Sequence, residues 1–331
     1  MSAENRDSGG RVRGTRDPEG PGPRRRPARS LRRHKIERAF LRGALAVVEL
    51  LPAGASSGFG RAVSRLYFLL FQARRRILLE NLTRAFPQMS RAQIRRIARD
   101  CAENLGAAFM EFLESSRLTR EDILSRVALE GEEHFAAARA RGKGVFLLSA
   151  HFGSWEIGAI RAGMIDGPIS SVVRPLDNPL LEEELEHRRT RFGNRVIRKK
   201  NAAREILRAI RAKETVAILV DQNVVAEEAV FVPFFGRPAA TTPSLALLQM
   251  KTDAAVVPVF TWPLGRGRYR LQFEKPILGE EFAAAGAGRE ERVRRATARY
   301  MEVTEKAIRE NPAAWLWMHN RWRTRPNGES V

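Results

Sequence analysis

The stretch GVFLLSAHFGSWE, residues 144–156, decides the fold of this chain. Its first half, GVFLLSA, is a short continuous apolar run, which is typical of a strand that is buried on both faces. Its second half turns polar, and the apolar spacing over residues 154–165 predicts a helix. A buried strand that leads directly into a helix is the repeating unit of a parallel α/β layer.

The same alternation continues along the chain. Apolar runs predict further strands at residues 169–173, 216–220, 256–262 and 269–273. Helical periodicity predicts helices at residues 90–115, 120–141, 178–192, 201–213, 243–252 and 289–310. Gly265 and Gly267 indicate that a hairpin joins the last two strands. The sequence therefore predicts an α/β fold with a mostly parallel central sheet flanked by helices.

The segment before this layer is apolar but carries charges. Arg42 and Glu49 interrupt residues 36–56, and Pro52 lies near the end of the run. A second apolar piece, residues 66–71, is followed two residues later by three arginines. Apolar helices beside basic clusters are typical of elements that lie in the interface of an anionic membrane. An amphipathic core helix and a membrane-spanning helix are the alternatives.

Composition limits the class of protein. The chain has 331 residues, 44% of them hydrophobic, which excludes a fully disordered or collagen-like chain. Its one cysteine, Cys101, excludes an internal disulfide. The net charge of +20 favours a polyanionic partner, which can be nucleic acid, anionic lipid or an acidic carrier.

Four regions follow from composition and pattern. Residues 1–30 are rich in arginine, glycine and proline and predict a disordered basic arm. Residues 31–89 form the helical segment that we expect to associate with a membrane. Residues 90–326 form the main domain, and residues 327–331 are a tail.

His151 and Glu156 are the candidate catalytic pair. Sites in open α/β sheets form beyond the carboxyl ends of the strands, and His151 follows such a strand directly. A carboxylate near a histidine can orient it as a general base. The alternative is that Ser154 and Glu156 only cap the helix. His151 and Glu156 are five residues apart and do not share a helix face as zinc ligands do, so we expect no metal and no other cofactor.

Two other strand ends carry polar residues. Arg174 follows the strand at residues 169–173, and its guanidinium suits phosphate or carboxylate, although a solvated loop arginine is the alternative. Asp221 and Gln222 follow the strand at residues 216–220. Asp221 is predicted to pair with Arg174 or to position a substrate hydroxyl, although aspartate is also common where loops begin.

Two aromatic segments remain open in interpretation. Residues 233–236, PFFG, form either the wall of an acyl-chain site in a loop or part of the core. Residues 315–323, WLWMHNRWR, interleave tryptophans with basic residues. They suit stacking on single-stranded nucleic acid, a lipid interface or the cover of a core. Composition does not separate these possibilities.

Taken together, the segments resemble the lysophospholipid acyltransferase superfamily, and more narrowly the late acyltransferases of lipid A biosynthesis, the lauroyl/myristoyl branch. Four blocks carry the resemblance in order, over roughly residues 35–326. They are residues 76–87, the H-x-x-x-x-E motif at 151–156, the pairs 174–175 and 221–222, and residues 315–322.

This resemblance implies a glycerol-phosphate-acyltransferase-like fold and a mechanism. His151, oriented by Glu156, takes the proton of a hydroxyl on a lipid A precursor or related glycolipid, which then attacks a fatty acyl thioester. Arg174 holds a phosphate or the phosphopantetheine of the donor, supported by Asp221. The resemblance also implies that Gln222 binds substrate, and that Asn320 and Arg321 do so because they match positions of the C-terminal block.

The resemblance also implies the partners. The acyl donor is acyl carrier protein or acyl-CoA, and no nucleic acid is expected. The protein is expected on the cytoplasmic face of the bacterial inner membrane, attached peripherally or by a single amino-terminal anchor. A lysophospholipid or a phosphatidylinositol mannoside-like acceptor is an alternative. A non-enzymatic protein that binds anionic lipid or nucleic acid is another.

Overall fold

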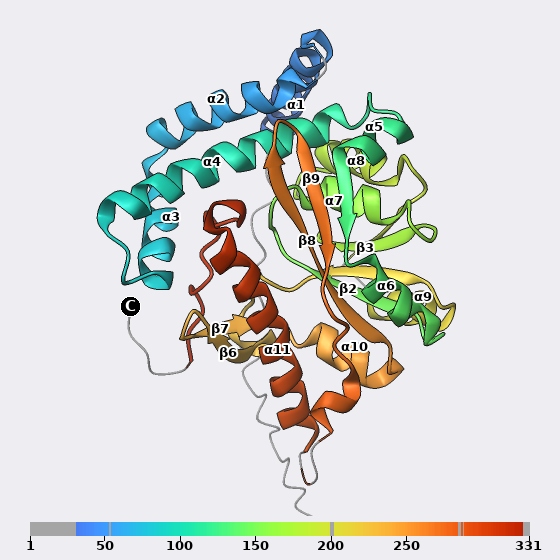
Figure 1. The fold of residues 1–331 in the computed structure, drawn as a ribbon. Helices are drawn as coiled ribbons and strands as arrows, with labels where there is room; N and C mark the ends of the chain where they lie inside the picture. The colour runs from blue at the N-terminus through green and yellow to red at the C-terminus, as the bar shows by residue number, and fades with distance from the viewer. Residues whose placement is uncertain (1–30, 53, 199–201, 284–285, 287, 327–331) are drawn as a thin grey trace, which may run out of the picture.

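The computed structural model describes residues 31–52, 54–198, 202–283, 286 and 288–326. Its centre is a seven-stranded sheet in the order β1-β9-β8-β2-β5-β3-β4 (Figure 1). The strands are β1 (Val127–Glu130), β2 (Val145–Ser149), β3 (Ile169–Val173), β4 (Arg195–Arg198), β5 (Thr215–Leu219), β8 (Ala255–Gly265) and β9 (Arg268–Phe273). Only β8 and β9 pair antiparallel within this sheet, across the predicted hairpin. The predicted mostly parallel sheet is confirmed.

Helices cover both faces of this sheet. Along β2, Val145 and Leu147 pack into one hydrophobic cluster, while Phe146 and Leu148 pack into another on the opposite face. The strand is continuously apolar because both of its faces are buried. The first face is covered by α5 (Arg120–Arg126), α6 (Glu132–Ala140), α7 (Trp155–Ala162) and α8 (Pro179–Thr190), and the second by α9 (Ala202–Arg211), α10 (Ser244–Thr252) and α11 (Arg289–Glu310).

The predicted helix over residues 120–141 is wrong in its middle. The chain leaves α5, forms β1 beside β9, and enters α6 only after Gly131, whose φ is 70°. The four residues of β1 are too few to interrupt a helical pattern in the sequence, and pairing with β9 decides their conformation. The edge strand β4 was not predicted either, because it alternates with exposed arginines and has no apolar run.

The two aromatic segments lie in the core. Phe234 and Phe235 belong to a separate antiparallel hairpin of β6 (Val230–Phe234) and β7 (Arg237–Thr241), and both are buried. Trp315, Trp317 and Trp322 are at most 5% exposed. The interpretations that place these rings in an exposed loop, on nucleic acid or at a lipid interface are therefore wrong, because the rings pack against one another.

The amino-terminal helices lie along one end and one side of the molecule (Figure 1). They are α1 (Leu31–Leu50), α2 (Ala55–Leu70) and α3 (Gln72–Ala85), followed by the long α4 (Arg91–Glu114). α2 crosses α4 closely at two glycines, since a Cβ on Gly60 would lie 2.3 Å from the carbonyl oxygen of Gly106. Among the helices that the structure describes, none has the length and hydropathy of a membrane span. The predicted arm and tail, residues 1–30 and 327–331, lie outside the described residues.

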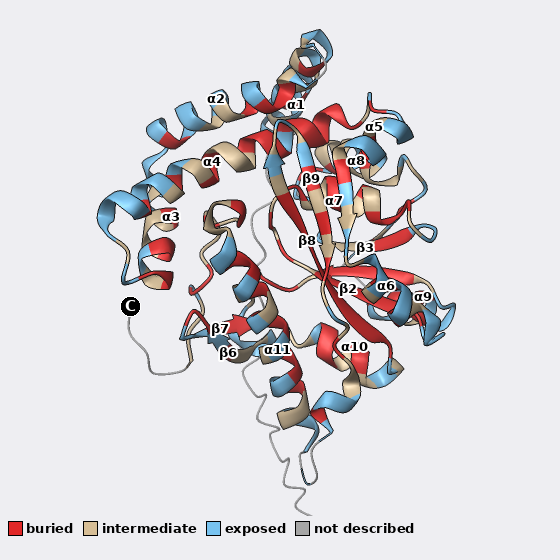
Figure 2. Cartoon of the chain, viewed as in Figure 1, coloured by how far each residue is buried: buried red, intermediate tan, exposed pale blue. Residues whose placement is uncertain are grey.

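Figure 2 shows that α1 and α2 carry many exposed residues, in pale blue, and several of these residues are large and apolar. We call this set the apolar helix surface: Ile36, Phe40, Leu50, Phe59, Val63, Leu66, Tyr67, Leu69, Leu70, Phe71 and Phe109. Leu66, Leu69 and Leu70 are 57–65% exposed, although they lie on the helix with the strongest apolar character of the three. A concentration of exposed apolar side chains in one region marks an interaction surface.

Candidate active site

The candidate residues meet at the carboxyl ends of three neighbouring strands. His151 follows β2, Asp221 and Gln222 follow β5, and Arg174 follows β3. β5 lies between β2 and β3, and Ser149 at the end of β2 is in register with Leu219 at the end of β5. The topology therefore brings together residues that are far apart in the sequence.

Asp221 holds His151 in two ways. Nδ1 of His151 donates a hydrogen bond to Oδ1 of Asp221 at 2.9 Å, and the backbone N–H of His151 donates to Oδ2 at 2.9 Å. The indole Nε1 of Trp315 also donates to Oδ2, at 2.7 Å. The Asp221 side chain is 2% exposed and that of His151 is 20% exposed. A carboxylate accepts only, so Nδ1 carries the proton and Nε2 is the free base.

The C-terminal segment fixes the loop that carries His151. The N–H of Gly153 donates to the carbonyl of Ala314 at 2.8 Å, and the N–H of Leu316 donates to the carbonyl of His151 at 3.0 Å. Gly153 has φ 58°, and a Cβ there would lie 1.7 Å from the carbonyl oxygen of Thr261. Only glycine fits this turn, which explains why the predicted strand–helix junction contains one.

The electrostatics of the pair favour a protonatable histidine. Burial lowers the pKa of His151, but the charge of Asp221, its hydrogen bond and the charge of Glu156 outweigh burial, so this pKa lies above its usual range. Burial raises the pKa of Asp221, but the imidazolium and the hydrogen bonds from His151 and Trp315 bring it down to about 2. Asp221 therefore stays ionised and stabilises the positive charge that His151 gains when it takes a proton.

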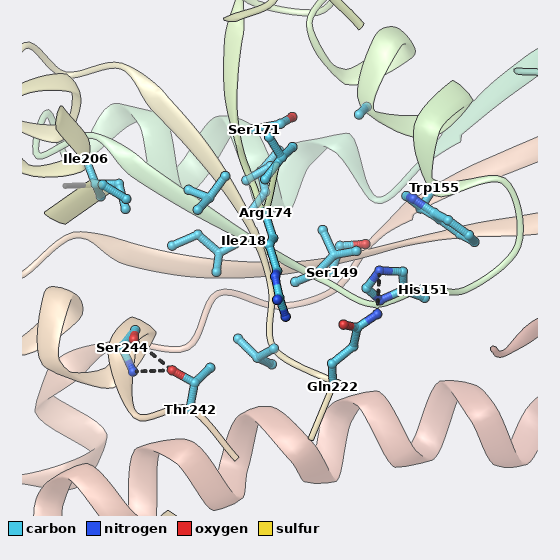
Figure 3. Close-up of a pocket in the computed structure, with 18 of the residues that line it drawn as sticks. Ser149, His151, Trp155, Ser171, Arg174, Ile206, Ile218, Gln222, Thr242 and Ser244 are labelled. Atoms are coloured by element: carbon cyan, nitrogen blue, oxygen red, sulfur yellow. Dashed lines mark hydrogen bonds between the residues drawn. The ribbon is translucent and has the colours of Figure 1, made fainter. Parts of the chain in front are cut away.

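Nε2 of His151 faces Gln222 and Trp155. The amide Nε2 of Gln222 lies 3.1 Å from Nε2 of His151, and Figure 3 shows the two side chains pointing toward each other. Because the histidine nitrogen is the acceptor, Gln222 is the donor. The ring of Trp155 meets the imidazole edge to face at 5.0 Å. Gln222 thus occupies the position where a substrate hydroxyl would donate its proton.

Glu156 is held by an arginine. Its carboxylate accepts hydrogen bonds from Arg189 on α8, at 2.6 Å from Nη2 and 3.0 Å from Nε. The sequence interpretation gave the orientation of His151 to Glu156, whereas Nδ1 of His151 is hydrogen-bonded to Asp221. The expected pairing of Asp221 with Arg174 is likewise not found, since the hydrogen bonds of Asp221 go to His151 and Trp315.

A large cavity adjoins these residues, with a volume of about 1390 Å³. His151, Glu156, Arg174 and Gln222 line it, and Figure 3 shows the Arg174 side chain in the same space as His151 and Gln222. Most of the other lining residues are apolar and come from β2, β3, β5, α7, α9 and α10. Mostly apolar cavities with a few placed polar groups are typical of ligand sites, and an apolar lining suits a lipid chain.

The C-terminal block contributes differently from expectation. Arg321 is fully buried, where it donates to the carbonyl of Ala240 and to Thr241, and neither Arg321 nor Asn320 is among the described residues that line the cavity. His319, in contrast, accepts a hydrogen bond from the backbone N–H of Asn223 at 2.8 Å and so fixes the loop beside Gln222. Burial lowers the pKa of His319 to about 4.

Sequence reasoning missed Trp315, His319 and Arg189 as parts of this site. The tryptophan and histidine were noted only within an aromatic and basic segment, and Arg189 lies in an ordinary charged helix. The resemblance of the C-terminal block to the family is the signal that could have identified Trp315 and His319. No local pattern in the sequence marks Arg189.

A histidine held by a carboxylate beside a large apolar cavity suits a base-catalysed reaction on a lipid substrate. Residues 27–324 match the model of the bacterial lipid A biosynthesis acyltransferases. The chain belongs to this family, and it is an acyltransferase.

Characterised relatives include several acyltransferases. The lipid A biosynthesis lauroyltransferase of Escherichia coli is 29% identical over 295 residues, which cover 86% of this chain and 91% of that protein. A lipid A biosynthesis acyltransferase of Haemophilus influenzae is 30% identical over 285 residues, with coverage of 82% and 83%. A phosphatidylinositol mannoside acyltransferase of Mycobacterium tuberculosis is 29% identical over 147 residues, 44% of this chain and 46% of that protein.

Proposed function

We propose that the protein transfers a fatty acyl group from the thioester of acyl carrier protein to a hydroxyl of a lipid A precursor or a related glycolipid. One observation carries the proposal: His151, whose Nδ1 is fixed by the buried Asp221 so that Nε2 is left unprotonated, lines a large and mostly apolar cavity of about 1390 Å³. The family membership supports the acceptor, since the relatives from Escherichia coli and Haemophilus influenzae are named as lipid A biosynthesis enzymes.

The reaction needs only a base and a means of holding the thioester. Nε2 of His151 takes the proton of the acceptor hydroxyl as its oxygen attacks the thioester carbonyl. The tetrahedral intermediate then collapses, the carbon–sulfur bond breaks, and the imidazolium returns the proton to the leaving thiolate. A positioned base contributes roughly 10²–10⁴ in rate. Asp221 is the positioning residue, because it fixes the tautomer and stabilises the imidazolium.

Gln222 has two roles in this scheme. In the unliganded site its amide donates to Nε2 of His151. When the acceptor hydroxyl takes that place, the amide is released toward the cavity and can donate to the developing oxyanion of the thioester. Preorganised donors of this kind typically contribute on the order of 10²–10³ in rate.

Glu156 and Arg174 act through charge. Glu156 raises the pKa of His151 from a distance while its own hydrogen bonds go to Arg189. The guanidinium of Arg174 lies exposed at the cavity and suits a phosphate of the acceptor. An exchange of Arg174 for lysine would keep the charge and lose the bidentate geometry.

The apolar helix surface supports a location on a membrane. It lies on α1, α2, α4 and the residue before α3, beside Arg74 and Arg76, which are exposed, and Arg75, which is half-buried. Such a surface inserts into the interface of an anionic leaflet without crossing it. We therefore place the protein on the cytoplasmic face of the bacterial inner membrane, where acyl carrier protein and a glycolipid acceptor can meet.

The decisive experiment is mass spectrometry of lipid products. Purified wild type and His151→Ala would be incubated with acyl carrier protein bearing mixed chain lengths and a lipid A precursor. The expected result is a mass gain of one acyl group with wild type only. If the acyl group is transferred instead to another lipid in a total bacterial extract, that lipid is the acceptor. Equal activity of wild type and His151→Ala would show that His151 is not the base.

A further inference from the structure

The cavity extends to both faces of the sheet. Alternate residues of a strand point to opposite faces, and both sets line the cavity: Leu147 and Ala217 belong to the cluster under α7, whereas Ile218 and Val220 belong to the cluster under α9 and α10. Two arms therefore meet at the strand ends beside His151.

The arm under α7 is enclosed, and we call it the closed arm. It is lined by Leu147, Ala159, Ala162, Ile169, Ala217, Val259 and Leu271. Except for the half-buried Ala159, these residues are at most 7% exposed. Ile169 is the first residue of β3 and Ala162 the last of α7, so both lie at the end of the arm farthest from His151. A blind apolar pocket of this kind suits the acyl chain of the donor, whose thioester must reach His151.

The second arm, which we call the open groove, runs between α9 and α10. It is lined by Ala202, Ala203, Ile206, Leu207, Leu247, Leu248 and Met250. Ala203 is exposed, and Leu207, Leu247 and Met250 are only half-buried, so this arm communicates with solvent along its length. Lys251 and Arg289 line its outer part, and both are exposed. Neither forms an ion pair within the part of the chain that the structure describes.

The lining of the cavity also reaches α1, on the opposite side of the molecule. Glu37 of α1 and Leu176 and Leu181 near α8 line it there, next to the apolar helix surface. In Figure 1, α1 and α2 lie at one end of the molecule, while α10 and the start of α11 lie at the other. A lipid acceptor drawn from a membrane held against α1 and α2 would reach His151 from the side of the cavity lined by α1. A water-soluble donor has to come from the other end.

We propose that the open groove binds the phosphopantetheine arm of the acyl donor, with its phosphate between Lys251 and Arg289, and that the carrier docks on the face opposite α1 and α2. The proposal rests on the function proposed above. The thioester end of this arm lies at His151 and the acyl chain fills the closed arm, which leaves the groove for pantetheine. The hydroxyls of Thr242 and Ser244, at the inner end of the groove, suit its amides.

The dimensions agree with this assignment. An extended phosphopantetheine arm is on the order of 18 Å long, comparable to five extended residues. The part of α10 from Ser244 to Lys251 spans about 10 Å at 1.5 Å per residue. The arm is therefore long enough to follow α10 and continue to His151. Its phosphate lies far from Arg174 in this arrangement, which leaves Arg174 for the acceptor.

The test compares donors that differ only in the phosphate. The Lys251→Ala/Arg289→Ala variant would be assayed with lauroyl-phosphopantetheine, lauroyl-pantetheine, lauroyl-CoA and lauroyl-acyl carrier protein. We expect the KM of the three phosphate-bearing donors to rise about tenfold or more, since charge-assisted hydrogen bonds are lost. The KM of lauroyl-pantetheine, the kcat and the KM of the acceptor should stay unchanged. A greater increase with acyl carrier protein than with CoA identifies the carrier as the docking partner.

The matched control removes one lysine and one arginine elsewhere. Lys275 and Arg95 are exposed and do not line the cavity, and Lys275→Ala/Arg95→Ala should keep wild-type KM values. The proposal is overturned if the two double variants have the same KM values. It is also overturned if the KM of lauroyl-pantetheine rises as much as that of lauroyl-phosphopantetheine, or if the KM of the acceptor rises and those of the donors do not. Failure of the wild type with every donor would contradict the proposed function and not this assignment alone.

Discussion

At the scale of single residues, the site depends on Asp221. Its two carboxylate oxygens bind the backbone and the ring of His151 and the indole of Trp315, so one buried anion sets the position, tautomer and charge of the candidate base. Glu156 contributes charge without contacting the imidazole. The two carboxylates therefore differ in what their removal should do.

The Asp221→Asn substitution separates these roles. An amide cannot stabilise the imidazolium as the carboxylate does, so we expect kcat to fall roughly 10³-fold. Because the charge of Asp221 raises the pKa of His151, the acidic limb of the pH–rate profile should move to lower pH. Glu156→Gln should shift this limb in the same direction with a smaller loss of kcat. Equal losses from the two variants would contradict the assignment of Asp221 as the positioning residue.

The lowered pKa of His319 predicts how the stability of the fold changes with pH. Its pKa in the folded protein is about 4, whereas an unfolded histidine titrates near 6.5. Between these values the unfolded state binds the additional proton, so the free energy of unfolding should fall as the pH decreases from 6.5 to 4.

The variant His319→Gln isolates this contribution. Glutamine offers a neutral acceptor for the N–H of Asn223, so the hydrogen bond can persist while the titration disappears. Urea unfolding of both proteins at several pH values should give a shallower dependence for the variant in that window. Parallel curves would show that His319 does not titrate as described.

At the scale of elements, α7 and β3 enclose the closed arm. Their small and branched side chains, Ala162 and Ile169, lie where the arm ends. A boundary built from two rigid elements sets a fixed length, because packed interiors do not deform continuously. Donor chain length is therefore expected to depend on these two positions.

Opposite substitutions at the end of the closed arm should have opposite effects. Ala162→Leu fills space, and if it removes room for two methylenes at about 0.8 kcal/mol each, the ratio of short to long donors should rise roughly tenfold. Ile169→Ala opens space and should favour longer chains, with some loss of stability. Competition among mixed acyl thioesters, read by mass spectrometry, gives the ratio directly. An unchanged ratio in both folded variants would place the acyl chain elsewhere.

The elements also show what sequence patterns can predict. β2, β3, β5, β8 and β9 were predicted because strands buried in a layered fold carry continuous or near-continuous apolar runs. β1 and β4 are short edge strands, and their conformation is decided by pairing with a neighbour. Similarly, His151, Asp221 and Gln222 could be placed at strand ends, but the choice of partner for Asp221 could not be predicted. That choice depends on a tryptophan that approaches from far along the chain.

At the scale of the whole molecule, the surface proposed for membrane binding and the groove proposed for the donor are separated. The apolar helix surface lies at one end, and the charged outer part of the open groove lies at the other (Figure 1). The site is between them. A protein arranged in this way can stay on a membrane while it exchanges a soluble donor.

The triple substitution Leu66→Ser/Leu69→Ser/Leu70→Ser tests the membrane contact. These side chains are exposed, so their loss should leave the fold intact and reduce binding to anionic vesicles at least tenfold. The control Leu124→Ser/Val225→Ser/Leu264→Ser changes other exposed apolar residues, 41–53% exposed, outside this surface. Vesicle flotation at low and high salt would measure both the apolar and the electrostatic part of binding. Equal binding of the two triple variants would remove the surface from membrane attachment.

The contact between Trp315 and Asp221 has a consequence for the order of events during synthesis. His151 and Asp221 leave the ribosome well before Trp315, and so do the strands that carry them. Until the C-terminal segment arrives, the loop at Gly153 lacks its backbone partner and Asp221 lacks one of its donors. A nascent or prematurely terminated chain would therefore fold much of its sheet and still lack a competent base. The candidate site is complete only when the C-terminal segment has joined it.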